Sequence, residues 1–108
     1  SQTRFRLITN SVMDVMTKLT DRAYDLVIYR HNPEDLSFAI SEAHRILRSG
    51  GVFVIDNFFG GGKVPDPAQR DPKTVALREA GKLIKNDNDS WITSLAPIGD
   101  GLLLATKL

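Results

Sequence analysis

The feature that most constrains the fold is a helical segment that lies between two strongly apolar runs, residues 24–29 and 52–55. Each run is nearly continuous in apolar character, which is typical of strands covered on both faces in a parallel sheet. Between them, Asn-Pro-Glu-Asp at 32–35 predicts a helix start, because a capping side chain, an early proline and acidic residues favour a helix N-terminus. We expect this helix to run to about Leu47 and Gly50 to stop it. Two strands joined by a helix predict a parallel pair with a right-handed crossover.

The remaining segments extend this α/β pattern along the whole chain. A short strand is predicted at residues 5–9, followed by a helix at 12–19. A long loop rich in glycine and proline follows at 58–72, then a helix at about 73–85 and two strands at 91–95 and 102–105. The order predicts an α/β fold with a mostly parallel sheet that ends in an antiparallel hairpin.

Length and composition fit one globular domain. The 108 residues are 42% hydrophobic and 25% charged, near the globular average, and no apolar run is long enough to span a membrane. The formal net charge of +1, with both signs interspersed, offers no basic stripe for nucleic acid. The sequence has no cysteine, which excludes disulfides and thiolate metal sites and fits a reducing compartment. We therefore expect a cytoplasmic protein with neither a nucleic-acid nor a membrane partner.

Residues that directly follow the predicted strands are the candidates for a functional site. In open α/β sheets, ligands bind outside the carboxyl ends of the strands. Three clusters stand at such ends: residues 10–13, residues 30–32, and Asp56 with Asn57 before the glycine loop. The Gly-Gly-Gly-Lys sequence at 60–63 lacks the spacing and the following Ser or Thr of a phosphate-binding P-loop. We interpret it as a flexible loop beside a substrate pocket.

Four sequence motifs resemble those of one enzyme family. They are Tyr-Asp-Leu-Val at 24–27, Leu-Arg-Ser-Gly-Gly-Val-Phe-Val-Ile-Asp-Asn at 47–57, Thr-Val-Ala-Leu-Arg-Glu at 74–79 and Pro-Ile-Gly-Asp-Gly-Leu-Leu-Leu-Ala at 97–105. With the glycine loop, they resemble the catechol and caffeoyl-CoA type O-methyltransferases, especially the bacterial ones. The resemblance implies a partial Rossmann-like class I methyltransferase fold. Residues 1–108 would be the C-terminal part of a single domain, without its first two strands and the glycine-rich cofactor loop.

The resemblance also implies which residues meet the cofactor, S-adenosylmethionine. Val12 and Met13, at the start of the first predicted helix, correspond to positions that contact the adenine. Arg30, His31 and Asn32 follow the next strand and belong to the same implied cofactor site. The alternatives are that Val12 and Met13 only pack their helix and that His31 is a solvated or capping residue.

Asp56 and Asn57 match the family's acid-amide pair, which helps to bind a divalent cation that orients the substrate oxygens. This chain departs from the family at two nearby positions. Arg30 stands where a second metal-binding aspartate is usual, and Pro33 replaces a lysine that can take the proton of the reacting hydroxyl. The departure predicts weak or absent metal dependence and a substrate or vestigial metal site at Asp56 and Asn57. Arg30 is expected to pair with Asp56 or to bind a carboxylate or phosphate of a substrate. The structural alternative is that Asp56 caps the strand end and Asn57 makes a turn.

The resemblance implies an enzyme that transfers a methyl group to a hydroxyl of a small acceptor. The alternative is a catalytically silent methyltransferase-like protein that serves in binding or assembly. Because the cofactor loop is absent, we expect the isolated chain to bind S-adenosylmethionine weakly if at all. We also expect a homodimer or higher oligomer, in which the strand at 5–9 or the apolar edge at 24–29 meets a partner molecule.

Overall fold

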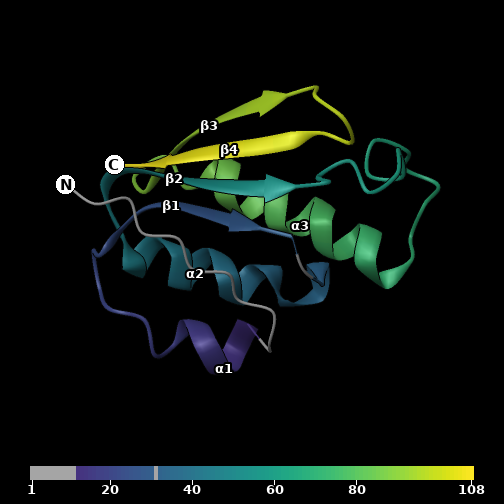
Figure 1. Cartoon of the computed structure of the whole chain (residues 1–108). Coiled ribbons are helices and arrows are strands. Elements are labelled where there is room, and N and C mark those ends of the chain that lie inside the picture. The colour runs from purple at the N-terminus through teal and green to yellow at the C-terminus, as the bar shows by residue number, and fades with distance from the viewer. Residues whose placement is uncertain (1–11, 31) are drawn as a thin grey trace.

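The described residues fold into one four-stranded sheet with the helices on one side of it. The structure, a computed structural model, describes residues 12–30 and 32–108 (Figure 1). Its elements are α1 (Val12–Met16), β1 (Tyr24–Tyr29), the 3-10 turn η1 (Pro33–Asp35), α2 (Leu36–Ile46), β2 (Leu47–Asp56), α3 (Pro72–Asn86), β3 (Trp91–Ala96) and β4 (Leu102–Lys107). The strands lie in the order β1-β2-β4-β3. Figure 1 shows α1, α2 and α3 on the same side of this sheet.

The strand pairing confirms the α/β fold and the antiparallel ending. β1 and β2 are parallel and are joined through α2, whereas β4 pairs antiparallel with both β2 and β3. The strand predicted at 24–29 has the bounds of β1. The strand predicted at 5–9 lies outside the described residues. Among the described pairings, one is parallel and two are antiparallel.

The start of the central helical segment is as predicted, but its end is not. The Asn32 side chain accepts a hydrogen bond from the Glu34 backbone N–H at 3.2 Å and caps η1, which leads into α2. The helix ends at Ile46, and Leu47 already has extended backbone geometry. A long-range contact accounts for this end. The buried ammonium of Lys107, on β4, donates to the carbonyl oxygen of Leu47 at 2.8 Å.

β2 begins five residues earlier than the predicted strand and contains an irregularity. In the register with β1, Tyr24 is opposite Leu47 and Leu26 is opposite Val52. Residues 48–51 of β2 therefore lie opposite Asp25 alone and form a bulge. Gly50, expected to stop the helix, lies inside this bulge with a φ of +85°. A Cβ at Gly51 would lie 3.2 Å from the carbonyl oxygen of Asp25, so glycine permits the close approach of the two strands.

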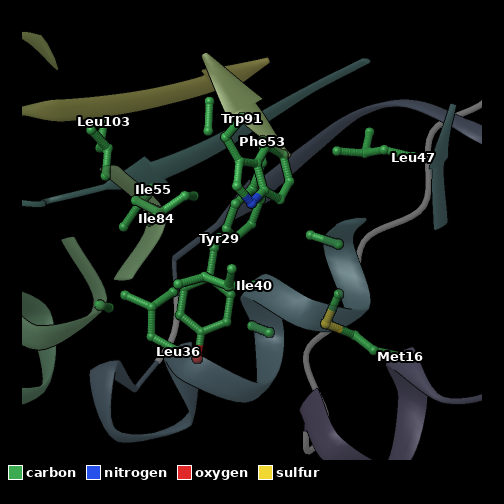
Figure 2. Packing of buried hydrophobic residues seen from close by; sticks show 14 of the residues in the cluster. Met16, Tyr29, Leu36, Ile40, Leu47, Phe53, Ile55, Ile84, Trp91 and Leu103 are labelled. Carbon is green, nitrogen blue, oxygen red and sulfur yellow. The ribbon is translucent and has the colours of Figure 1, made fainter. Parts of the chain in front are cut away.

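The hydrophobic core fills the space between the sheet and the helices. Phe53 and Ile55 of β2, and Leu103 of β4, point to this side and are almost fully buried (Figure 2). The Phe53 ring lies between two other aromatic rings, with centroid distances of 6.5 Å to Tyr29 and 6.0 Å to Trp91. Burial of these side chains holds β1, β2 and β3 against α2 and α3.

The opposite face of the sheet is apolar and open in the part of the chain that the structure describes. Leu26 and Ile28 of β1 are 52% and 55% exposed, and Ile92 of β3 is 61% exposed. The registers place further apolar residues on this outer face, namely Val52, Val54, Leu102 and Leu104. The prediction that the strand at 24–29 is covered on both faces is therefore wrong for the described residues. The reason is that all described helices pack on the other face.

Arg45 of α2 attaches the N-terminal segment to the rest of the domain. Its guanidinium donates to the carbonyl oxygens of Met16 at 2.8 Å and Leu19 at 2.7 Å, and pairs with Asp21 and Glu42. These contacts tie the backbone at and just after the end of α1 to α2. The predicted first helix accordingly stops at Met16 rather than at residue 19 and continues as hydrogen-bonded turns. Within the described residues, no helix is long and apolar enough to cross a membrane.

Candidate functional site

A cavity of about 310 Å³ lies at the carboxyl ends of β1 and β2, the position at which open α/β sheets bind ligands. The ends of the two strands, η1 and the start of α2, the glycine loop and the first turns of α3 form its walls. Its lining residues are Tyr29, Arg30, Pro33, Leu36, Ile55, Asp56, Asn57, Gly60, Lys63, Asp71, Lys73, Thr74 and Leu77. The cavity thus brings Arg30 together with Asp56 and Asn57, as the resemblance implies.

Arg30 and Asp56 form the ion pair expected from the sequence. Arg30 Nε lies 2.9 Å from Asp56 Oδ2, with Arg30 69% exposed and Asp56 26% exposed. Asp56 Oδ1 accepts a hydrogen bond from the Asn57 backbone N–H at 2.8 Å. Asn57 has a φ of +54°, so it makes the left-handed turn into the loop. Asp56 thus caps the strand end and Asn57 makes a turn, as the structural alternative predicts. Both residues also line the cavity.

The residues around this pair do not fit a divalent cation. A guanidinium in direct contact with Asp56 places a fixed positive charge where the ion would have to approach. Over the described ranges, 12–30 and 32–108, the side chains form no cluster of three or more His, Cys, Asp or Glu that could hold a metal. A metal ion therefore has no part in the chemistry that the described residues support.

Tyr29 lines the cavity, a position that was not predicted from the sequence. Its hydroxyl donates a hydrogen bond to the Asn32 carbonyl oxygen at 2.7 Å. Burial, with a smaller contribution from the negative charge of Asp35, raises the pKa of Tyr29 to about 12. The phenol therefore stays protonated near neutral pH and cannot act as a base there. Its position as the last residue of an apolar strand was the available signal.

The glycine loop is held by hydrogen bonds at several points. Arg78 of α3 donates to the carbonyl oxygens of Val64, Asp66 and Gln69, at distances from 3.0 to 3.3 Å. At the other end of the loop, the Gly61 backbone N–H donates to Asp100 Oδ2 at 2.7 Å. The loop that was predicted to be flexible is thus anchored by Arg78 of α3 and by Asp100, and contacts between such distant residues have no local sequence signal.

Asp71 caps the N-terminus of α3, the helix that forms one wall of the cavity. Its carboxylate accepts hydrogen bonds from the backbone N–H of Thr74 at 3.1 Å and from the Thr74 hydroxyl at 2.7 Å. These bonds, helped by the nearby charge of Lys63, lower the pKa of Asp71 below its ordinary value. Asp71 is thus an ionised helix cap. The Asp-Pro pair at 71–72 signalled this cap, but nothing in the sequence placed Lys63 and Lys73 at the same cavity.

Of the residues assigned to the cofactor by resemblance, the structure describes only part. The side chains of Val12 and Met13, and the whole of His31, lie outside the described residues. The Asn32 side chain caps η1, and the Arg30 side chain pairs with Asp56. Their contacts with a cofactor stay predictions.

The described residues fit S-adenosylmethionine only in part. The cavity lies at the expected strand ends, but its two carboxylates, Asp56 and Asp71, are already hydrogen-bonded within the protein. Each oxygen of these carboxylates already has a protein partner, so neither carboxylate is held free for the ribose hydroxyls of the cofactor. The described residues therefore do not form a complete site for S-adenosylmethionine.

Comparison with known sequences relates nearly the whole chain to one family. Residues 5–108 match the family described as O-methyltransferase. A Mycobacterium tuberculosis protein described as a probable O-methyltransferase is 41% identical over 104 residues, which are 96% of this chain and 46% of that protein. A relative from Mycobacterium avium, also named as an O-methyltransferase, is 42% identical over 104 residues with the same coverage. The chain thus spans about half the length of the curated relatives it matches.

Solved structures share the fold over the same extent. A Corynebacterium glutamicum protein superposes with a TM-score of 0.83 at 30% identity, over 94% of this chain and 47% of that one. The O-methyltransferase TomG of Streptomyces achromogenes, solved in complex with S-adenosylmethionine, has a TM-score of 0.72 at 26% identity, over 90% and 47%. A cofactor-bound protein of Mycobacterium tuberculosis has a TM-score of 0.74 at 25% identity, over 94% and 48%.

Proposed function

Because this chain belongs to the O-methyltransferase family, we propose that it forms the acceptor side of an S-adenosylmethionine-dependent O-methyltransferase site. The reaction would transfer a methyl group to a hydroxyl of a small molecule. The observation that carries the proposal is the cavity at the carboxyl ends of β1 and β2, in a chain whose fold matches the C-terminal part of class I methyltransferases. One neighbour with this fold was solved with S-adenosylmethionine bound, which supports the choice of cofactor.

Positioning is the main contribution that the described residues can make to catalysis. Bound S-adenosylmethionine would supply an electrophilic methyl group. The acceptor oxygen would bond to the methyl carbon as the bond from carbon to sulfur breaks, S-adenosylhomocysteine would leave, and the hydroxyl proton would pass to solvent. Asp56 is paired with Arg30, whose fixed positive charge opposes a metal ion at this carboxylate, and the raised pKa of Tyr29 excludes its phenolate as a base near pH 7. Holding the two reactants in line can by itself account for a large part of the rate enhancement of such a displacement.

The donor half of the site has to come from residues beyond those described. The chain spans 46% of its Mycobacterium tuberculosis relative, and the two carboxylates that line the cavity already have partners within the protein. The direct test uses a chimera in which this chain replaces the matching segment of that relative. We expect S-adenosylmethionine to bind the chimera in calorimetry and the chain alone weakly if at all. A folded chimera without binding would contradict the proposal, and binding without methyl transfer would favour a catalytically silent protein.

We propose in addition that the isolated chain self-associates through β1. This strand is at an edge of the described sheet, and Leu26 and Ile28 expose apolar surface beside it. An unpaired edge next to an apolar face is a template for another strand. A second copy of β1 fits this edge, because two identical strands can pair antiparallel across a twofold axis.

A further inference from the structure

The charged side chains that line the cavity are unequally engaged. Its two carboxylates, on Asp56 and Asp71, accept hydrogen bonds or an ion pair from the protein. Its three cations are Arg30, Lys63 and Lys73. Across the part of the chain that the structure describes, neither lysine ammonium has a hydrogen bond or an ion pair, and Lys63 acts on Asp71 only through its nearby charge.

Arg30 also retains donors beyond its contact with Asp56. The ion pair is made through its Nε, and the two terminal nitrogens have no hydrogen bond to any residue within 12–30 or 32–108. A guanidinium can use such a pair of N–H groups to bind a carboxylate or a phosphate in a bidentate manner. The donors that remain available around the cavity are therefore mainly cationic.

From this imbalance we infer that the methyl acceptor carries an anionic group, a carboxylate or a phosphate, which Arg30, Lys63 and Lys73 bind. The inference rests on the proposed function for the identity of the ligand as a methyl acceptor. The anionic group would anchor the acceptor by its charge, and its hydroxyl would then face the donor. Arg30, whose positive charge opposes a metal ion at Asp56, would instead help to orient the substrate.

The test is a titration of the isotopically labelled whole chain with two probes, followed by NMR through the amides of Asn57, Gly60 and Thr74. The probes are 3,4-dihydroxybenzoate and neutral catechol, which share the two hydroxyls and differ in the carboxylate. We expect dihydroxybenzoate to bind about tenfold more tightly than catechol, because a hydrogen bond to a charged group usually contributes at least this much to affinity. Its affinity should fall as salt is added. Inorganic phosphate should compete with it if the same donors accept phosphate.

Four variants separate this site from general charge effects. K63Q and K73Q should each weaken dihydroxybenzoate binding severalfold, whereas K82Q, which removes the same charge from a lysine paired with Glu79 outside the cavity, should not. The double variant R30Q/D56N removes the ion pair without changing the net charge, so its loss of affinity reports Arg30 itself.

Equal binding of the two probes, no binding of either, or equal effects of K63Q, K73Q and K82Q would overturn the inference. The titration contains no S-adenosylmethionine, so its result is independent of whether the chimera transfers a methyl group. Dihydroxybenzoate preference without methyl transfer would refute the proposed function alone, and methyl transfer without that preference would refute the anionic acceptor alone.

Discussion

Arg78 donates to the backbone carbonyl oxygen of Val64 from both Nε and Nη2, at 3.3 and 3.2 Å. With two further loop carbonyls on Nη2, this side chain ties the loop that walls the cavity to α3. We predict that Arg78→Gln destabilises the protein by about 1–2 kcal/mol, because carbonyl groups lose charged donors. Urea unfolding and the rate of proteolysis within residues 58–71 measure the effect. Arg70→Gln removes the same charge from an exposed loop residue, and an equal effect there would contradict this role.

Gly81 of α3 packs against the ring of Phe58. A Cβ at Gly81 would lie 2.6 Å from Phe58 Cζ. Gly81→Ala should therefore destabilise the fold by roughly 1–3 kcal/mol through overpacking, whereas helix propensity alone predicts a gain of about 1 kcal/mol. Thermal unfolding decides the sign. Combining the change with Phe58→Leu should recover part of the loss, and a stabilised Gly81→Ala variant would show that the ring moves away at little cost.

The proposed self-association depends on the exposed apolar residues of β1. Leu26→Lys and Ile28→Lys should shift the isolated chain toward monomer, because a charge on this face must be desolvated when a second strand pairs beside it. Sedimentation velocity at micromolar concentration measures the shift. Leu83→Lys on α3 is the matched control, since Leu83 and Leu26 are both 52% exposed. A wild-type chain that sediments as a monomer would refute the self-association.

His44 makes stability depend on pH. Burial first, and then the charge of Lys107, lower the pKa of His44 below its ordinary value, although Asp87 acts in the opposite direction. The unfolded chain therefore binds the proton more readily than the folded one, so stability is full above the unfolded pKa, near 6.5, and declines as the pH falls below it. Urea unfolding at several pH values should show this decline, and His44→Gln should reduce it. An unchanged profile in the variant would exclude His44 as its source.

Local signals predicted several elements correctly, because short-range interactions determine them. Asn32 caps η1 through its own side chain, β1 has the bounds of its apolar run, and the last two strands are joined by a turn at Gly and Pro residues. The Arg30–Asp56 ion pair was also foreseen, since both residues directly follow neighbouring parallel strands.

The features that were missed depend on contacts between distant segments. The end of α2 involves Lys107, sixty positions beyond Leu47, and the bulge in β2 follows the close approach of Gly51 to Asp25. The path of the glycine loop, which places Lys63 at the cavity, depends on Arg78. Periodicity and capping patterns carry no information about such pairings.

If this chain provides the acceptor wall of a methyltransferase site, the chimera should transfer a methyl group. The measurement uses the chimera with isotopically labelled S-adenosylmethionine, dihydroxybenzoate and no added metal. We predict labelled product with one hydroxyl methylated, and a marked loss of transfer in R30Q/D56N and K63Q but not in K82Q. A folded chimera that binds S-adenosylmethionine but methylates neither dihydroxybenzoate nor catechol would contradict the claim.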